Sequence, residues 1–387
     1  MVVVFEFLDE EPIENVITYM NYKADKVVYF GYEDTIYDQQ KQTEQFLKKH
    51  CGVASVSFHA LPSGDLQAIL NIMRREIQAE LAQGNQIYFD ITGGENLILV
   101  AFGMLSHEFD TPMHLYDVYE DKIIELDEGA SSCLSRDVEA KKVPMSLDLM
   151  IEMHGGAINY KRTKKIHKIS DPKYVEDMNK IYDVAKSHGR YWNSFSAFLA
   201  KYMPAEGDGL SVSRLAYTVL NGLNNMGNNL RPKELNAILD DLGKKGLLLN
   251  VVHENGKYRF TYKNKNVKDC LTEGGVILEL HTYQEELDSG NDCLSGVFLD
   301  WDGKISDDSN DDVINEIDVL SLHGNIGTFI SCKNGKMDNK TALTALYELK
   351  TVARRFGGKY AKMILVSAWP LSAVHLERAK EMGIEVR

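Results

Sequence analysis

The stretch IYFDITGGENLILVAFG, residues 87–103, sets a short buried strand directly before a pair of glycines and a second apolar segment. The strand is expected to end at Asp90, and Gly93 and Gly94 lie where a helix is expected to begin. Glycine permits positive φ and lets another molecule approach the backbone, while the first turn of a helix favours anions. The pattern alone leaves two interpretations open: a turn that only joins strand to helix, or a cradle for an anionic ligand.

Apolar runs like this one recur along the N-terminal part of the chain and alternate with amphipathic segments typical of helices. This alternation predicts βαβ units and a parallel, doubly wound α/β sheet. Ligands bind such sheets at the carboxyl ends of the strands, which is where Gly93 and Gly94 fall. The expected strands are 2–8, 26–31, 53–59 and 86–90, with helices at 34–50 and 65–83 and a closing hairpin at 113–126.

The bulk composition limits the class of protein. A chain of 387 residues predicts two or three domains. No apolar run is long enough for a transmembrane helix, and MVVVFEFLDEEP at the N-terminus resembles a strand rather than a signal peptide. The five scattered cysteines form no CxxC pair and favour a reducing, cytoplasmic location. The net charge of −14 disfavours an always-on nucleic-acid binder but allows a local basic groove beside acidic metal ligands.

The middle of the chain predicts helices followed by a hairpin. Helices are expected at 213–228 and 232–246, and the hairpin at 247–264 turns at Asn255-Gly256. This order is typical of a winged helix. The second helix carries acidic residues beside its lysines, which favours a spacer or dimerisation unit over a reader of the major groove. The aromatic segment 191–202 is expected in a core or an interface, and the charged run 161–168 on a solvated surface.

The C-terminal third places acidic residues and a lysine on neighbouring elements. Glu279 falls on a predicted helix, and the segment 313–336 predicts two strands around a turn at Gly324-Asn325. Period-two alternation sets Glu316 and Asp318 on one face of the first strand, and Ser331 and Lys333 on one face of the second. Carboxylates beside a lysine suit metal-assisted cleavage of a phosphodiester. Asp300 and Asp302 are weaker candidates, and the acidic loop 307–312 is expected to be solvated or to bind a divalent ion loosely.

The DITGG strand end after three βα units resembles the CARF domain, the sensor of cyclic oligoadenylate in type III CRISPR defence. Members commonly carry D-x-T-G-G-T-K, where this chain has DITGGEN, so Glu95 and Asn96 replace Thr-Lys. The resemblance implies a pocket shared across a homodimer and a cyclic tetra-adenylate activator. The residues it places at the pocket are Thr92, Gly93, Gly94 and Asn96, flanked by Asp9, Glu10, Tyr32 and Glu33.

The order of helical glutamate, NEIDV and FISCK resembles the PD-(D/E)xK nuclease superfamily, whose fold is restriction-endonuclease-like. The resemblance implies Lys333, Asp318, Glu279 and Ser331 as catalytic residues, with Ser331 standing where the family has a carboxylate. Glu348 on the following helix is the candidate for a migrated acid. The implied ligands for Mn²⁺ or Mg²⁺ are Asp318, Glu279, Glu316 and the carbonyl of Cys332.

The two resemblances together predict a CARF sensor at 1–140, a helical linker with a winged-helix-like segment at 141–268 and a nuclease domain at 269–387. The expected function is a cyclic-oligoadenylate-activated, metal-dependent endonuclease that cuts single-stranded DNA or RNA or nicks duplex DNA. A ligand can switch such an enzyme only if it binds the active dimer more tightly than the inactive one. The alternatives are a CARF and winged-helix transcription regulator, a binding module with a degenerate nuclease domain, and a ring nuclease that cleaves its own activator.

Overall fold

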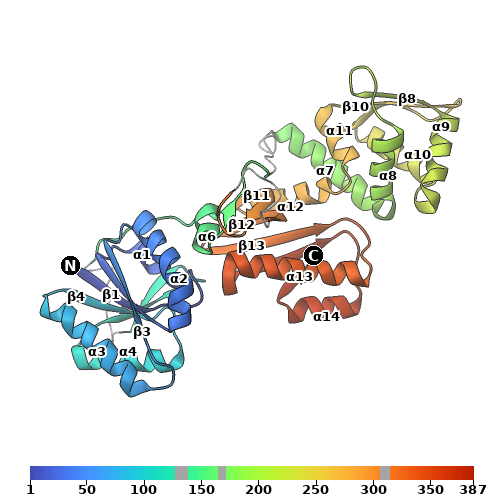
Figure 1. The fold of residues 1–387 in the computed structure, drawn as a ribbon. Coiled ribbons are helices and arrows are strands. Elements are labelled where there is room, and N and C mark those ends of the chain that lie inside the picture. Colours follow the sequence, from blue (N-terminus) through green and yellow to red (C-terminus); the bar gives the residue numbers. More distant parts are fainter. Residues whose placement is uncertain (127–137, 164–170, 306–313) are drawn as a thin grey trace.

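The computed structural model of the chain describes residues 1–126, 138–163, 171–305 and 314–387. Figure 1 shows a doubly wound domain at the N-terminal end, a second α/β layer carrying the C-terminus, and a helical unit at the far end. The acidic loop 307–312, Cys133 and most of the charged run 161–168 lie outside the described residues. No helix in the described part is long and apolar enough to cross a membrane.

The N-terminal sheet has the strand order β3-β2-β1-β4-β5-β6, with β1 to β5 parallel and β6 antiparallel. Its order reverses between β1 and β4, which confirms the predicted doubly wound sheet and its closing hairpin. The strands are β1 (Val2–Phe7), β2 (Lys26–Gly31), β3 (Ser55–Ala60), β4 (Gln86–Asp90), β5 (Met113–Asp117) and β6 (Lys122–Glu125). The helices are α1 (Ile17–Asn21), α2 (Glu33–Phe46), the π-helical turn Leu47–Cys51, α3 (Leu66–Ala82) and α4 (Asn96–Phe109).

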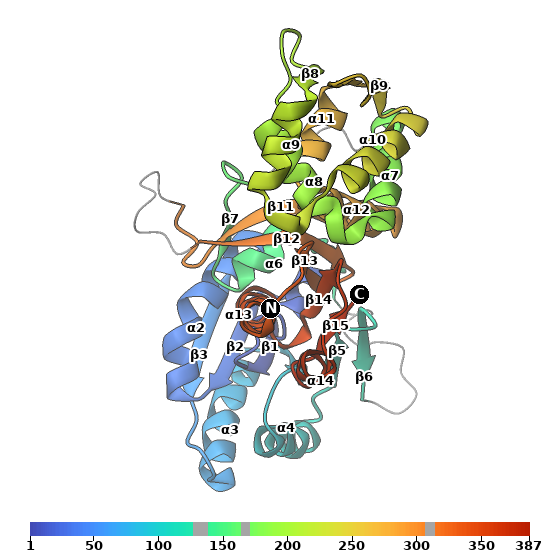
Figure 2. The ribbon, with the colours of Figure 1, turned by 90° about the vertical axis from the view of Figure 1, so that its right-hand side faces the viewer.

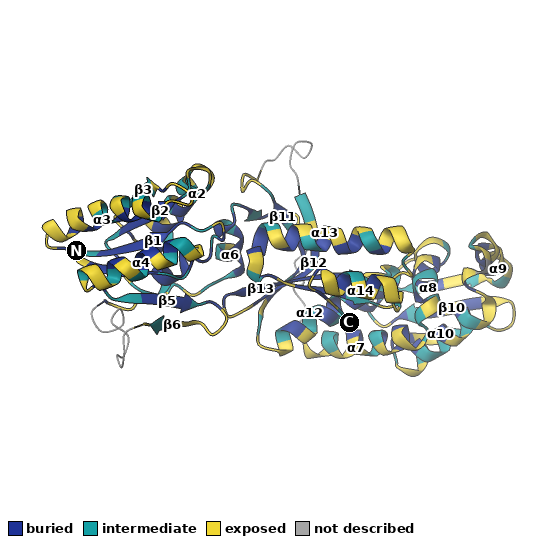
Figure 3. Ribbon diagram, turned by 90° about the horizontal axis from the view of Figure 1, so that it is seen from below, coloured by how far each residue is buried: buried dark blue, intermediate teal, exposed yellow. Residues whose placement is uncertain are grey.

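Two apolar cores lie on the two faces of this sheet, because successive side chains of a strand point to opposite sides. Val4 of β1 packs with α1 and the end of α2, whereas Val3 and Phe5 pack with α3 and α4. The central strands β1, β2 and β4 are buried while the outer faces of the helices are exposed (Figure 3).

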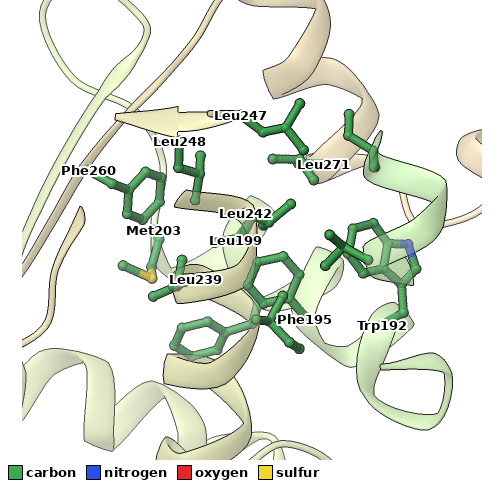
Figure 4. Packing of buried hydrophobic residues seen from close by; sticks show 14 of the residues in the cluster. Trp192, Phe195, Leu199, Met203, Leu239, Leu242, Leu247, Leu248, Phe260 and Leu271 are labelled. Atoms are coloured by element: carbon green, nitrogen blue, oxygen red, sulfur yellow. The ribbon is translucent and has the colours of Figure 1, made fainter. Parts of the chain in front are cut away.

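The middle unit has its own core, centred on Trp192, Phe195 and Leu199 of the aromatic segment (Figure 4). Its helices are α7 (Pro172–Ser187), α8 (Gly189–Tyr202), α9 (Ala216–Asn225), the 3₁₀ turn Gly227–Asn229, α10 (Pro232–Lys244) and α11 (Lys265–Thr272). A small sheet of order β8-β10-β9 is formed by β8 (Ser211–Leu215), β9 (Leu248–Val252) and β10 (Lys257–Tyr262). The order α8-β8-α9-α10-β9-β10 is that of a winged helix.

One expectation for this unit is wrong. The helix predicted at 213–228 begins only at Ala216, because Ser211–Leu215 form β8 and pair antiparallel with β10. The hairpin turn at Asn255-Gly256 is confirmed, and both residues have positive φ. That conformation is the one a two-residue type I′ turn requires.

The C-terminal sheet has the strand order β15-β14-β13-β12-β11-β7. β13, β14 and β15 run parallel, and the remaining neighbours pair antiparallel. The strands are β7 (Ala157–Ile158), β11 (Asp292–Asp300), β12 (Ile314–His323), β13 (Ile326–Lys333), β14 (Lys362–Ser367) and β15 (Ile384–Val386). The helices are α6 (Leu147–Met153), α12 (Val276–Asp288), α13 (Asn339–Gly357), the 3₁₀ turn Gly358–Tyr360 and α14 (Ala373–Glu381).

Helices cover both faces of this sheet. Leu346 and Leu349 of α13 pack on one face together with Met150 of α6, while Tyr283 and Leu287 of α12 pack on the other. The segment containing α6 and β7 thus joins the C-terminal layer, although it precedes the winged helix in sequence. Figure 2 shows the middle unit lying beyond this layer, on the side of α12.

Candidate functional site

The ends of β12 and β13 bring three predicted nuclease residues together. The strands pair with Val319 opposite Ile330, so the next residue on each strand brings Asp318 beside Ser331. Ser331 Oγ donates to Asp318 Oδ2 over 3.2 Å, and Lys333 Nζ lies 3.9 Å from the same oxygen. One carboxylate therefore orders the hydroxyl and the lysine at the strand end.

The backbone of β13 strengthens this arrangement. The amide N–H of Cys332 donates to Asp318 Oδ2 over 2.6 Å, a short charge-assisted bond. The Cys332 side chain turns toward α12, where its Sγ lies 3.7 Å from Thr282 Oγ1. Burial raises the pKa of the Cys332 thiol, and the nearby carboxylates of Asp318 and Glu279 raise it further. Glu279 and Asp318 thus flank the same cysteine from different elements.

The oxygen donors fit a hard divalent cation. No group of three or more His, Cys, Asp or Glu with metal-binding geometry occurs among the described residues. Magnesium needs no such cage, because it binds through one or two carboxylates and completes its shell with water and substrate phosphate. In such a site Asp318 of β12 and Glu279 of α12 would supply the carboxylates, and Cys332 would add its backbone carbonyl. The donor set suits Mg²⁺ or Mn²⁺.

Two other predicted residues, Glu316 and Glu348, are exposed. Glu316 is exposed on β12, where it pairs in register with Phe298. Glu348 is exposed on α13, next to Leu349, which packs into the core. Within the described ranges no hydrogen bond joins Glu348 to Asp318 or Lys333. Asp300 is buried and accepts from the Lys304 amide over 3.1 Å, so it holds a turn at the end of β11.

One contact at this site was missed by sequence reasoning. Asn334, which directly follows Lys333, donates to Asn193 Oδ1 over 2.7 Å. Asn193 Nδ2 donates back to the Asn334 carbonyl over 2.9 Å. Helix α8 of the middle unit therefore holds the chain immediately after the lysine. The only signal in the sequence was the turn dipeptide Asn334-Gly335, which says nothing about a partner so far away along the chain.

The glycine pair lies at the switch point of the N-terminal sheet, between β1 and β4. The Gly94 amide donates to Asp9 Oδ2 over 3.1 Å, and Gly94 has a φ of 124°. A Cβ on Gly93 would come within 2.9 Å of the Asp9 Cβ. Both glycines are therefore required where the loop after β1 meets the loop after β4.

The remaining predicted pocket residues divide into two groups. Tyr32 donates its hydroxyl to Glu95 Oε2 over 2.9 Å, and burial followed by this hydrogen bond raises the pKa of Tyr32. Asn96 begins α4 next to Glu95. Glu10 and Glu33 are exposed beside them, and the Glu10 carbonyl accepts from Gln39.

Thr92 faces inward. Its hydroxyl donates to Asp90 Oδ1 and accepts from the Tyr116 amide over 2.7 Å. The side chain thereby ties the glycine turn to β5, so its hydroxyl is already engaged within the domain.

A buried polar network underlies the glycine turn, and sequence reasoning missed it. Glu6 is fully buried and accepts from the Tyr19 hydroxyl over 2.7 Å. His114 Nε2 lies 3.4 Å from Asp90 Oδ2, at ion-pair distance without hydrogen-bond geometry. Burial strongly raises the pKa of Glu6, and the charge of Asp90 raises it further. Burial also raises the pKa of Asp90, but His114 and hydrogen bonds from its neighbours outweigh that effect and lower it.

Comparison with known families identifies the C-terminal part. Residues 267–387 match the profile of the family described as Card1-like, endonuclease domain. The C-terminal third is a Card1-like endonuclease domain. The lysine and carboxylates at the ends of β12, β13 and α12 all belong to this Card1-like domain. A search of curated protein sequences found no significant match.

Solved structures share the fold of the whole chain. The crystal structure of protein VC1899 from Vibrio cholerae has a TM-score of 0.68 at 18% identity, covering 100% of this chain and 93% of its own. Can2 from Sulfobacillus thermosulfidooxidans, solved in complex with cyclic tetra-adenylate, has a TM-score of 0.64 at 15% identity. That match covers 100% of this chain and 95% of Can2. The predicted arrangement of a doubly wound domain, a winged helix and an α/β nuclease layer is confirmed as a fold.

Proposed function

We propose that this protein is an endonuclease of type III CRISPR antiviral defence that is activated by cyclic oligoadenylate and depends on a divalent metal. The observation that carries the proposal is the position of Lys333 and Asp318, 3.9 Å apart, inside a Card1-like endonuclease domain. The activator proposed is cyclic tetra-adenylate, and the substrate is a nucleic-acid strand.

The chemistry assigned to the nuclease site follows from its geometry. Asp318 and Glu279, with the Cys332 carbonyl, would hold the metal ion, which when bound polarises the phosphate and lowers the pKa of water. Lys333 orients the attacking water and offsets negative charge that develops on the phosphate oxygens. Ser331 stays hydrogen-bonded to Asp318 and fixes the direction of its carboxylate. Each group is attached to a strand or helix, so the site is held rigidly.

The sensor is assigned to the switch point between β1 and β4. Gly93 and Gly94 leave the backbone without side chains at the start of α4, where helix amides favour phosphate, and Asp9 Oδ2 accepts from the Gly94 amide until a ligand takes its place. Asp9 and Tyr32 border this backbone from the loops after β1 and β2. Can2, which shares the fold over the whole chain, was solved with cyclic tetra-adenylate bound. We place the ligand of this chain at the corresponding edge of its N-terminal sheet.

A homodimer is part of the proposal. Helix α4, which begins beside the glycine turn, exposes Val100 (51%) and Met104 (48%) on one face. Apolar residues one helical turn apart form a continuous stripe, which is suited to pack against a second copy. A two-fold axis next to this helix would also join two glycine turns around one cyclic ligand.

The test is a cleavage assay on the full chain. Purified protein is incubated with labelled single-stranded DNA, single-stranded RNA and plasmid DNA, with Mn²⁺ or Mg²⁺, and with cyclic tetra- or hexa-adenylate. The proposal expects cleavage of at least one substrate that requires both metal and a cyclic oligoadenylate. Cleavage that is the same with and without the cyclic nucleotide would contradict the proposed activation. No cleavage under any combination would contradict the proposed nuclease activity.

A transcription regulator remains the second candidate, because the middle unit has the element order of a winged helix. Its helix α10, however, uses its acidic residues inside the unit: His253 lies 2.8 Å from Asp240, and His188 lies 2.9 Å from Asp241. These carboxylates oppose close approach to DNA phosphates. A gel shift with duplex promoter DNA in the absence of metal would favour this candidate.

A further inference from the structure

A cavity of about 710 Å³ lies close to Lys333 in the C-terminal domain. Its two walls are the segments that follow β13 and β14, with the first turns of α13 and α14. These segments start from adjacent points, because Lys333 pairs in register with Ser367 and the Ala368 amide donates to the Lys333 carbonyl over 3.0 Å. The cavity therefore adjoins the cluster assigned to catalysis.

The lining of this cavity combines cationic and aromatic side chains. Lys336 and Lys340 are exposed in the wall that follows β13, and Trp369 is partly exposed in the wall that follows β14. Asp338 is the acidic member, and its carboxylate caps α13 by accepting from the Thr341 amide over 2.7 Å. This carboxylate keeps its negative charge, but the two lysines outnumber it in the lining of the cavity.

The base of the cavity is fixed by packing. His375 is 6% exposed, and its Nδ1 lies 2.9 Å from Ser372 Oγ at the start of α14. Met337 and Leu371, one from each wall, pack against the apolar core below the sheet. The cavity is therefore formed before any ligand arrives, which lowers the entropy lost on binding.

We propose that this cavity binds an unpaired nucleotide adjacent to the scissile phosphate. Trp369 stacks on its base, and Lys336 and Lys340 bind the phosphates on either side. A base inside a duplex has both faces covered by its neighbours, so stacking on Trp369 requires a single strand. The proposal rests on the proposed nuclease function and adds to it a subsite for one unpaired nucleotide, formed by Trp369, Lys336 and Lys340.

The first test measures binding without cleavage. Fluorescence anisotropy follows fluorescein-labelled oligothymidylate and oligouridylate on the full chain, with cyclic tetra-adenylate and EDTA present. Loss of one stacked base predicts that Trp369→Ala raises the Kd about 5- to 150-fold for the preferred strand. Trp369→Phe, which keeps an aromatic face, should recover most of this loss. Lys380→Ala, near the end of α14 and outside the cavity, is the matched control and should bind like the wild type.

The second test separates charge from stacking. The logarithm of the binding constant is measured against the logarithm of salt concentration for Lys336→Ala and Lys340→Ala. Each phosphate contact that is lost should reduce the slope by about 0.7 for a single strand. Trp369→Ala should leave the slope unchanged. Slopes equal to that of the wild type in both lysine variants would overturn the phosphate assignment.

The outcomes distinguish this inference from the proposed function. If wild-type protein binds the strands through Trp369 but never cleaves them, the proposed nuclease activity is contradicted and the assignment of the cavity is supported. Wild-type protein that cleaves them, while Trp369→Ala binds and cleaves equally well, would overturn the cavity assignment alone. A labelled duplex should bind more weakly and respond less to Trp369→Ala, and an equal response would contradict a single-stranded substrate. Comparing the two oligonucleotides tells DNA from RNA.

Discussion

The backbone amide of Lys359 donates a hydrogen bond of 2.6 Å to Glu11 Oε2, joining the loop after β1 to the end of α13. The Glu11 amide in turn donates to Asp9 Oδ1 over 3.0 Å, and Asp9 holds the amide of Gly94. A continuous series of hydrogen bonds therefore runs from the glycine turn of the N-terminal domain to the nuclease domain. A ligand that moves Asp9 would directly change this series of hydrogen bonds.

Glu14 tests whether this junction transmits the signal. Its carboxylate lies 2.8 Å from Lys359 Nζ and also accepts from the Tyr360 hydroxyl. Glu14→Gln removes the charge and weakens the junction by about 1 kcal/mol, since the Lys359 ammonium is half-exposed. We expect normal binding of cyclic tetra-adenylate but a smaller stimulation of cleavage at saturation. Glu44→Gln, which breaks the pair between Glu44 of α2 and Lys48 of the following π-helical turn, is the control. Equal stimulation of cleavage in both variants would show that the junction does not transmit the signal.

Lys333→Ala should abolish most cleavage while leaving the sensor intact. Removing a group that stabilises developing charge typically lowers the rate by about 10²–10³-fold. Asp318→Ala should lose at least as much, because Asp318 also orders Ser331 and the Cys332 amide. Initial rates on the preferred strand measure the effect, and calorimetry with cyclic tetra-adenylate checks that affinity is retained. Cleavage at the wild-type rate in either variant would place the active site elsewhere.

Ser331 and Glu348 compete for the role of the carboxylate that the PD-(D/E)xK pattern expects. Ser331 contacts Asp318, whereas Glu348 is exposed on α13. Ser331→Ala is therefore expected to lower the cleavage rate several-fold, in line with a lost hydrogen bond of about 1 kcal/mol to a carboxylate. Glu348→Ala should cleave within about two-fold of the wild type, as surface changes cost about 0.5 kcal/mol or less. The reverse order of effects would assign the catalytic carboxylate to Glu348.

The sequence predicts those parts of the molecule that depend on local pattern. The strand ending at Asp90 and the strand pair carrying Asp318 and Lys333 follow from alternation and turn residues, and the structure has them within a few residues. β8 could not be found this way, because the strand character of Ser211–Leu215 comes from pairing with β10, some 45 residues later in the chain.

Contacts between residues far apart in the chain could not be predicted either, because they too depend on distant partners. Glu11 meets Lys359 across 348 residues, and Asn193 meets Asn334 across 141. No periodicity encodes such a pair, since each side chain is an ordinary polar residue until the domains pack. The motifs indicate the two candidate sites, and only the fold gives the connection between them.

Gly93→Ala tests the ligand pocket through sterics. The added Cβ would come within 2.9 Å of Asp9 Cβ, so Asp9 must shift and its bond to the Gly94 amide weakens. We expect at least about a ten-fold loss in affinity for cyclic tetra-adenylate, or roughly 1.4 kcal/mol. Gly189→Ala is the control, because a Cβ there meets nothing within 4 Å. Calorimetry measures the affinity of both variants for cyclic tetra-adenylate. Unchanged affinity in Gly93→Ala would show that the ligand does not bind at this turn.

Glu6 should make the stability of the sensor domain depend on pH. Burial raises the pKa of Glu6 above its ordinary value of 4.5, so the folded protein holds a proton that the unfolded chain releases. The stability that this proton contributes is complete below pH 4.5 and is lost as the pH rises toward the folded pKa, by about 1.4 kcal/mol per pH unit. Glu6→Gln keeps an acceptor for Tyr19 and cannot ionise. Its melting temperature should therefore match the wild type near pH 4.5 and exceed it increasingly as the pH rises above that value, as thermal unfolding at a series of pH values would measure. A difference that stays constant across this range would mean that Glu6 does not hold the proton in the folded domain.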